Sequence, residues 1–309
     1  MGRLRDRMEA ELGNWQSRLP DAWRAKFDGA ALDFAACDPD AELDDDEPIW
    51  PQETNAGGAP GAHLFKALKD LAPGGVRAVI FGNDPYTRLT QATGRSFEQG
   101  DLSDWAGDLR VARRVSPSLL SVLCAAAATD PRAAGYGLTD TRQLMPTEGN
   151  GQPVWFCHVE FVRALGAGAV ALPPPRDIFA SWTRQGVLWL NRTLTYTRWL
   201  DAQNRDTHRS SHQRVWAPFT SRMLSLLVEQ AMTRPIVIVL WGSSAADLGQ
   251  AAVALGQAQG VPAGNIRLVS TGHPQWPEGY FKVGNPLTQI SYALGAGGAA
   301  IDWTGAGGG

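Results

Sequence analysis

The chain has few cysteines and lacks the spacing with which cysteines usually bind metals. Among 309 residues there are three, Cys37, Cys124 and Cys157, and none belongs to a C-x-x-C pair. This spacing argues against a zinc or iron–sulfur site, and isolated thiols suit a reducing cytosol. We therefore expect a cytoplasmic protein that holds no metal.

Long apolar runs and a large net charge are missing as well. No stretch of about 18 apolar residues occurs, so we expect no membrane-spanning segment. The N-terminal residues lack the apolar core of a secretion signal. The net charge of −3 argues by itself against nucleic acid binding, for which a basic domain is typical.

Motifs of three large enzyme classes are also absent. The sequence contains no GxSxG turn, no phosphate-binding loop of the Walker type and no GxGxxG fingerprint. These absences argue against a serine hydrolase of the α/β type, a nucleotide triphosphatase and a dinucleotide enzyme.

The charges that are present are unevenly distributed. Residues 44–47 are four consecutive acids in a polar stretch that we expect to be a surface loop. Residues 184–222 carry seven arginines against two aspartates, a local excess of five positive charges. Such a segment could attract phosphates, although a solvated arginine-rich surface is the more common explanation for such a segment taken alone.

Four apolar runs rich in β-branched residues predict buried strands of a parallel sheet. They span residues 76–81, 187–190, 236–241 and 266–269. Helical patterns cover residues 1–30, 63–71, 117–128, 178–184, 215–232 and 245–255. Strands joined by helical crossovers predict an α/β fold with a doubly wound, four-stranded parallel sheet flanked by helices.

We expect a single domain over residues 1–309, a length that can bury a substantial core. Three segments are expected outside the central sheet: a helical and loop extension at 1–62, a surface excursion at 129–176, and a glycine-rich tail at 304–309. In the extension, four large apolar residues recur about once per helical turn and predict one buried helix face: Trp15, Leu19, Trp23 and Phe27.

Polar and aromatic residues follow the predicted strands at the edge where open α/β sheets bind ligands. Asp84 follows the first strand, Asn191 ends the second, and His273 follows the fourth. Tyr86 and Phe97 lie close behind Asp84 in the sequence. A carboxylate, an amide, an imidazole and two aromatic rings suit a planar polar heterocycle, but this spacing also describes several α/β hydrolases.

These motifs resemble the uracil-DNA glycosylase superfamily, and most closely its family 1. Residues 82–87 (GNDPYT) are similar to the first family motif, GQDPYH, and residues 272–274 (GHP) to the start of the last, HPSPLS. Other family segments have counterparts in order: IWP at 49–51, ATGRSF at 92–97, PSLL at 117–120, the strand ending in Asn191, LWG at 240–242 and IDW at 301–303. The resemblance covers roughly residues 49–303.

The resemblance implies hydrolysis of the N-glycosidic bond of deoxyuridine in DNA, as a step of base excision repair. The implied enzyme is a monomer that needs no cofactor and flips the nucleotide out of the base stack. Asp84 would activate or orient the attacking water and stabilise the cationic sugar. His273 would donate a hydrogen bond to uracil O2 as the base leaves.

The same resemblance implies the residues that select the base and bind DNA. Asn191 would read the N3 and O4 edge of uracil, Phe97 would stack on the ring, and Tyr86 would exclude the methyl group of thymine. Asn83 is a further candidate for substrate binding. Ser118, Ser270 and Trp276 are the candidates for DNA binding.

The chain departs from the family in its first and last motifs. Asn83 replaces a glutamine, Thr87 replaces a histidine, and Arg95 introduces charge near Phe97. The segment QWPE at 275–278 replaces SPLS, so the leucine that wedges into the duplex has no counterpart. Trp276 could take that place because aromatic faces stack on bases, or it could pack against its own loop.

Structural roles remain as alternatives for the candidate residues. Asp84 could cap a turn, Asn191 could bond neighbouring backbone, and His273 could be a buried structural histidine. At the level of function, the alternative is a homologue without catalysis, or with broader specificity, that binds uracil-containing or damaged DNA.

Overall fold

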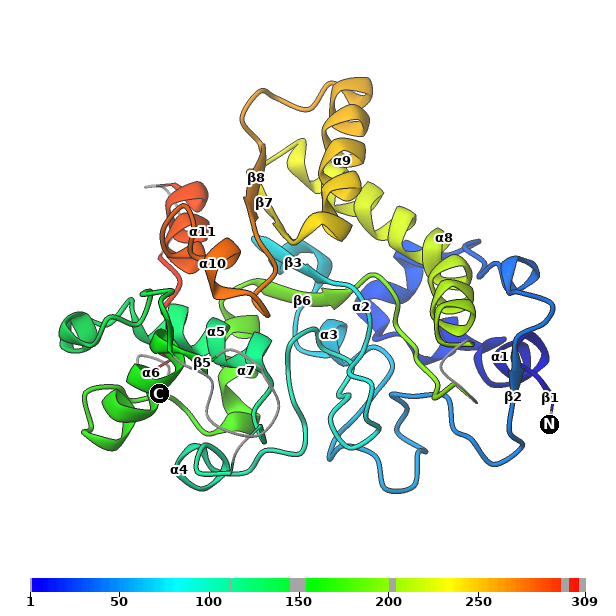
Figure 1. Ribbon diagram of the computed structural model, residues 1–309. Helices are drawn as coiled ribbons and strands as arrows, with labels where there is room; N and C mark the ends of the chain where they lie inside the picture. The colour runs from blue at the N-terminus through cyan, green and yellow to red at the C-terminus, as the bar shows by residue number, and fades with distance from the viewer. Residues whose placement is uncertain (1, 112, 145–153, 200–203, 296–299, 306–309) are drawn as a thin grey trace.

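A computed structural model describes residues 2–111, 113–144, 154–199, 204–295 and 300–305 (Figure 1). Parts of the expected excursion (145–153) and of the expected tail (306–309) lie outside these residues. In the described parts of the chain, every helix is too short or too polar to cross a membrane.

The four predicted strands form one parallel sheet, as expected. They are β3 (Ala78–Gly82), β6 (Val187–Asn191), β7 (Ile236–Trp241) and β8 (Ile266–Thr271). The spatial order is β6-β3-β7-β8, and all three neighbouring pairs are parallel. β3, β6 and β7 are buried along their whole length, which is why they read as continuous apolar runs in the sequence.

Helices cover both faces of the sheet (Figure 1). One face packs against α1 (Leu4–Leu12), α2 (Asp21–Arg24), α3 (Lys66–Lys69), α8 (Arg205–Ala231) and α9 (Ala246–Gln259). The other packs against α4 (Trp105–Asp108), α5 (Pro117–Ala127), α6 (Phe156–Gly166), α7 (Pro175–Arg184), α10 (Pro277–Tyr280) and α11 (Pro286–Leu294). Two short antiparallel strand pairs lie outside the central sheet: β1 (Gly2–Arg3) with β2 (Glu42–Leu43), and β4 (Gln143–Leu144) with β5 (Val154–Trp155).

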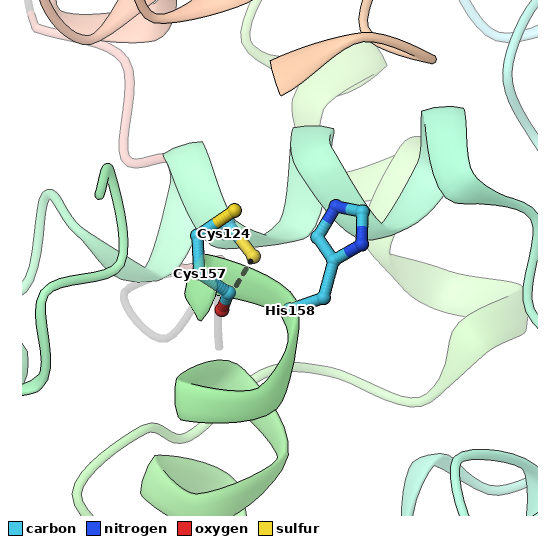
Figure 2. A group of neighbouring side chains, drawn as sticks. All are labelled: Cys124, Cys157 and His158. Carbon is cyan, nitrogen blue, oxygen red and sulfur yellow. Dashed lines mark hydrogen bonds between the residues drawn. The ribbon is translucent and has the colours of Figure 1, made fainter. Parts of the chain in front are cut away.

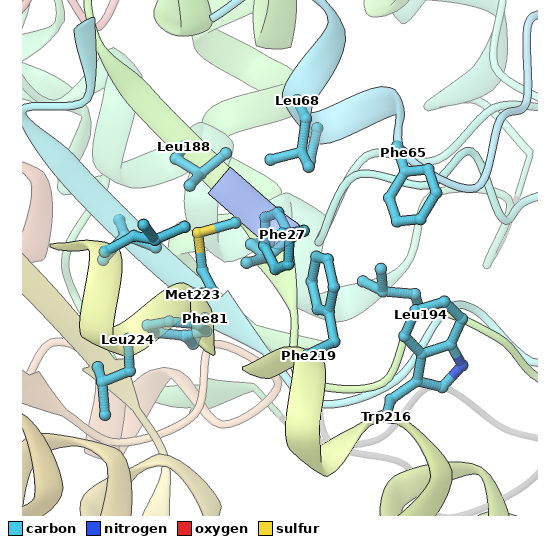
Figure 3. Close-up of a cluster of buried hydrophobic side chains, with 14 of the residues drawn as sticks. Phe27, Phe65, Leu68, Phe81, Leu188, Leu194, Trp216, Phe219, Met223 and Leu224 are labelled. Carbon is cyan, nitrogen blue, oxygen red and sulfur yellow. The ribbon is translucent and has the colours of Figure 1, made fainter. Parts of the chain in front are cut away.

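Alternate residues of each strand supply the two cores, because successive side chains point to opposite faces of a sheet. In β3, Val79 and Phe81 face the α8 side, whereas Ala78 and Ile80 face the α5 side. The α8-side core is rich in aromatic rings, and Figure 3 shows Phe27 from the N-terminal segment beside Phe219 of α8. Their rings stack with centroids 4.7 Å apart.

The N-terminal segment is buried as its pattern predicted, but it is not one helix. All four apolar residues of that pattern are buried: Trp15, Leu19, Trp23 and Phe27. After α1 ends at Leu12, Trp15, Trp23 and Phe27 lie on two short 3-10 turns and α2, and Leu19 directly follows the first of these turns. Gly13 and Pro20 explain the breaks, since glycine and proline both disfavour a helix interior.

Two segments contribute more to the core than the sequence predicted. α6 lies inside the expected surface excursion, yet Cys157, Phe161 and Ala164 are fully buried against α5. Near the C-terminus, Trp303 is also buried, and Trp182 Nε1 of α7 donates a hydrogen bond to its carbonyl oxygen. The expected excursion is therefore only partly a surface feature.

A buried polar network ties α8 to the segment after β6. Nδ1 of His212 lies 2.9 Å from Thr195 Oγ1, and its Nε2 lies 3.1 Å from Thr197 Oγ1. Burial, and after it the neighbouring His208, lowers the pKa of His212 to about 3. His212 is therefore neutral in the folded protein at neutral pH.

This burial predicts a loss of stability in mild acid. His212 stays neutral in the folded protein but takes a proton in the unfolded chain, so its contribution is full above pH ~6.5 and declines below it. At pH ~4 the free energy of unfolding should be smaller by about 3 kcal/mol. Urea unfolding across this range measures the effect, and His212→Gln should flatten the profile. An equally steep profile in the variant would assign the loss to other groups.

Candidate active site

The carboxyl ends of the central strands open into one cavity of about 470 Å³. Five residues that the sequence singled out lie in its wall: Asp84, Tyr86, Phe97, Asn191 and His273. Asn83 and Ser118 line it as well. These residues come from segments far apart in the chain, and the parallel sheet brings them together because its strands all end at the same edge.

Close packing at the end of β3 fixes the floor of the cavity. A Cβ atom on Gly82 would lie 2.3 Å from Asn191 Oδ1 and 2.7 Å from Ser96 Cβ, so only glycine fits here. The backbone nitrogen of Arg192 donates to the Gly82 carbonyl at 2.9 Å, which continues the pairing of β3 with β6. Asn191 is consequently buried and held directly beside the first motif.

Asp84 accepts two hydrogen bonds from α8. Arg209 Nε lies 2.6 Å from Asp84 Oδ2, and Gln213 Nε2 lies 3.3 Å from Asp84 Oδ1. The Asp84 side chain is 11% exposed, whereas Arg209 is 44% exposed. The Asp84 carboxylate therefore lies in the cavity wall and forms an ion pair with the Arg209 guanidinium.

Two aromatic side chains form one wall of the cavity. The Tyr86 hydroxyl donates to the Phe97 carbonyl at 3.1 Å and lies 2.8 Å from Ser116 Oγ. Phe97 has a left-handed backbone (φ 61°), a conformation that non-glycine residues rarely adopt. Its ring packs edge-on against Trp241, with centroids 5.3 Å apart. The tyrosine thus holds the phenylalanine in a backbone conformation that costs energy, as is common at functional sites.

His273 is held in one orientation by its own loop. Its Nδ1 accepts a hydrogen bond from the Gln275 backbone nitrogen at 3.1 Å, which places the ring proton on Nε2. Burial lowers the pKa of His273, so the neutral form is favoured. Gly242 (φ 90°) permits this arrangement, because a Cβ there would approach His273 Cβ to 3.1 Å. A neutral imidazole with an Nε2 proton can donate one hydrogen bond to a ligand.

The candidates for DNA binding lie in three different places. Ser118 is in the first turn of α5 and lines the cavity. Trp276 lies in the loop after His273, and half of its surface is exposed to solvent. Ser270 lies on β8 and borders shallow hollows beside Leu268, outside the cavity wall.

Two of the residues that depart from the family motifs, Thr87 and Arg95, line the cavity. Thr87 lies exposed at the cavity edge. Arg95 lines the cavity, but its guanidinium pairs with Asp70 at 2.6 Å and with Glu98 at 3.2 Å. Its charge is therefore compensated inside the protein. The Glu278 carboxylate accepts a hydrogen bond from Gln143 at 2.9 Å.

Sequence reasoning missed the contribution of α8 and the segment before it. Arg205 and Arg209 of α8 line the cavity, together with Tyr196 and Trp199. Burial, and after it the charge of Asp84, raises the pKa of Tyr196 to about 12. The excess of arginine over residues 184–222 was a signal, and the spacing of 205, 209 and 213 marks one helix face. Nothing in the sequence showed that this face meets Asp84.

A group of possible metal ligands lies on the α5 side of the sheet, and it is the one such group within the described residues. Atoms of Cys124, Cys157 and His158 lie within 4.8 Å of one another (Figure 2). Two of these side chains already have partners, since Cys124 Sγ donates to the Cys157 carbonyl and His158 Nε2 lies 3.0 Å from Ser121 Oγ. Burial raises the pKa of the Cys124 thiol well above its usual range, which opposes the thiolate that a metal requires. We assign no metal to this group.

Comparisons with known proteins agree with the fold and the motifs. No protein-family model matches the chain. A uracil-DNA glycosylase of Rhizobium meliloti (strain 1021) is 32% identical over 188 residues, which are 60% of this chain and 53% of that protein. A uracil-DNA glycosylase of Deinococcus radiodurans is 26% identical over 247 residues, which are 79% of this chain and 73% of that protein. For the first relatives, the matched part spans only between 53% and 58% of their length.

Solved structures support the fold. The UNG crystal structure from Nitratifractor salsuginis is 17% identical and superposes with a TM-score of 0.55 over 95% of this chain and 98% of that chain. A mimivirus UNG variant in complex with UGI gives the same TM-score, 0.55, over 93% of this chain and 90% of that chain. The chain is thus similar in sequence to uracil-DNA glycosylases, and it shares the fold of the solved UNG structures.

Proposed function

We propose that the protein is a uracil-DNA glycosylase, which hydrolyses the N-glycosidic bond of deoxyuridine in DNA. One observation carries the proposal: Asp84, Asn191 and His273 converge on a single cavity that is also lined by Tyr86 and Phe97. Its volume of about 470 Å³ suits a small molecule or a flipped nucleotide. The curated relatives described above carry this name.

The proposed chemistry needs no cofactor. The bond between the sugar C1′ and uracil N1 breaks, and its electron pair leaves with the base as an anion. A water molecule adds to C1′ and loses a proton, and the uracil anion takes up a proton from solvent, so the products are free uracil and an abasic sugar. The Asp84 carboxylate would stabilise the positive charge on the sugar and accept the proton of the water. Nε2 of His273, which carries the ring proton, would donate to uracil O2 as negative charge develops.

The remaining residues would select the base. The buried Asn191 amide offers both a donor and an acceptor, and in one orientation these match O4 and N3–H of uracil. Phe97 would stack on the ring. Tyr86 would occupy the space beside C5, and Asn83 would contact the substrate from the floor of the cavity.

Binding to DNA would use groups around the cavity opening. Ser118 in the first turn of α5 would contact a phosphate, since helix N-termini attract anions. The half-exposed Trp276 would stack on a base or enter the space that the flipped nucleotide leaves. For Ser270, which lies outside the cavity wall, the proposed DNA contact is supported by the family resemblance only. We further propose that the enzyme acts as a monomer in the cytoplasm, where its three free cysteines stay reduced.

An alkali-cleavage assay tests the function. The protein is incubated with a labelled oligonucleotide containing one uracil, either single-stranded or paired, and then with hot alkali. An abasic site breaks under these conditions, whereas binding without catalysis leaves the strand intact. Cleavage at the uracil supports the proposal. An intact strand with a mobility shift would instead indicate a homologue that only binds DNA.

Tyr86→Ala should admit thymine, because the substitution opens the space beside C5. Release of thymine from an oligonucleotide is measured beside release of uracil. The matched control is Tyr86→Phe, which keeps the ring and removes the hydroxyl that contacts Phe97 and Ser116. The alanine variant should release thymine and the phenylalanine variant should not. Retained uracil release with no thymine release in the alanine variant would remove this role from Tyr86.

A further inference from the structure

We propose that Arg209 is a positioning residue with two partners, Asp84 in the free enzyme and a DNA phosphate in the complex. In this scheme the arrival of DNA draws Arg209 away, and only then is the Asp84 carboxylate available for catalysis. The inference rests on the proposed glycosylase function and adds a control of the same site.

The resting contact is direct and closely aligned. Arg209 Nε donates to Asp84 Oδ2 at 2.6 Å, and Gln213 one turn later in α8 donates to Asp84 Oδ1 at 3.3 Å. Both carboxylate oxygens therefore have a protein donor. The two donors come from one face of one helix, so they approach Asp84 together.

This contact opposes the proposed chemistry. Positive charge develops on the sugar next to Asp84 as the glycosidic bond breaks, and a guanidinium on the same carboxylate repels that charge. A productive complex is thus favoured when the arginine has another anion to bind.

The surroundings of Arg209 allow such a transfer. Its side chain is 44% exposed, whereas Asp84 is 11% exposed, so the arginine is the partner with room to move. Arg209 also lines a second hollow of about 610 Å³ on the other side of Asn83, together with Ser210 and Arg192. The Arg192 charge is already paired with Asp247 at 2.9 Å. A guanidinium at this position suits a phosphate, which it binds with two parallel hydrogen bonds.

The first experiment replaces the arginine by a neutral side chain. Uracil release by Arg209→Gln is followed at several DNA and salt concentrations. We expect kcat/KM to fall about tenfold, with the loss in KM rather than in kcat, because one phosphate contact is lost. The slope of log kcat/KM against log salt concentration should become shallower by roughly 0.7–0.9 for the same reason. Arg209→Lys keeps the charge and should keep most of the salt slope.

The matched control is Arg214→Gln on the same helix. Arg214 lies 3.9 Å from Asp38 and is 47% exposed, similar to Arg209, but it does not line the cavity. It should retain the KM and salt slope of the parent protein. Thermal unfolding of all variants shows whether each one is folded.

The second experiment removes charge from the DNA. Single phosphates next to the deoxyuridine are replaced in turn by neutral methylphosphonates. At one position the parent protein should lose about tenfold in kcat/KM, and Arg209→Gln should lose nothing further there.

The outcomes separate the two proposals. If the parent protein releases no uracil, the proposed function itself fails. If the parent is active but folded Arg209→Gln loses about 100-fold or more in kcat, with KM and salt slope unchanged, Arg209 is a fixed support of Asp84 and the inference is wrong. Equal sensitivity of both proteins to every methylphosphonate would also overturn it.

Discussion

Replacing Asp84 by asparagine is expected to lower the rate of uracil release by about 10³-fold while leaving the protein folded. Asparagine has nearly the same shape but no charge, so it can neither stabilise a cationic sugar nor accept a proton from water. Asp84 lies in the cavity wall, where its charge acts at short range on a bound nucleotide. The fold should survive because the main packing of β3 depends on its apolar residues and on Gly82.

Single-turnover release of uracil measures the chemical step without product release. Asp247→Asn is the matched control, because Asp247 also pairs with an arginine near the site, Arg192, and is 65% exposed. This control should retain nearly full activity. A rate for Asp84→Asn close to that of the parent protein, in a folded sample, would exclude Asp84 as the catalytic carboxylate.

The sheet and its site could be predicted from the sequence because both depend on local patterns. Each central strand is a short apolar run, and the structure confirms all four with small differences at the ends. Once the strands are parallel, the residues that follow them must meet at one edge, so Asp84, Asn191 and His273 could be placed together. The order of the strands did not need to be known for this step.

The contacts of α8 with the site could not be predicted in the same way. Arg209 and Asp84 are 125 residues apart, and their pairing depends on how α8 packs across the sheet. The predicted helix began at Val215, whereas α8 begins at Arg205. The first ten residues of α8 are polar, and they lack the apolar spacing that marks a helix in sequence. The part of the helix that reaches the site is thus the part that was missed.

Burial of α6 was missed for a related reason. Its apolar residues are mixed with charged ones, and its neighbours are rich in glycine and proline, which suggested a loop. In the structure one face of α6 is buried, with Cys157, Phe161 and Ala164 against α5. The buried face of this 11-residue helix can be recognised only together with the helix that it packs against.

One departure from the family motifs, Arg95, adds no unpaired charge to the cavity. In the sequence, Arg95 introduces a charge near Phe97. Its guanidinium bonds Glu98 and Asp70, and Lys66 pairs with Glu98 at 3.0 Å. Two cations and two anions thus balance beneath the cavity.

His273→Ala is expected to lower the rate of uracil release by about 10²-fold to 10³-fold, the usual effect of losing one donor to a developing anion. His273→Gln should recover part of this loss, since its amide can also donate a hydrogen bond. Both rates are measured in single turnover beside the parent protein.

The pH profile tests the protonation state that this role requires. Burial lowers the pKa of His273, and the bond from the Gln275 nitrogen to Nδ1 favours the neutral ring with its proton on Nε2. The imidazole should therefore remain a neutral donor from pH ~8 down past ~6.5, the ordinary histidine value, and take a second proton only below it. The rate of the parent protein should be level over that range and change only in more acid solution. A step centred at or above pH ~6.5 that vanishes in His273→Ala would show that the histidine is cationic during catalysis, contrary to the geometry of its loop.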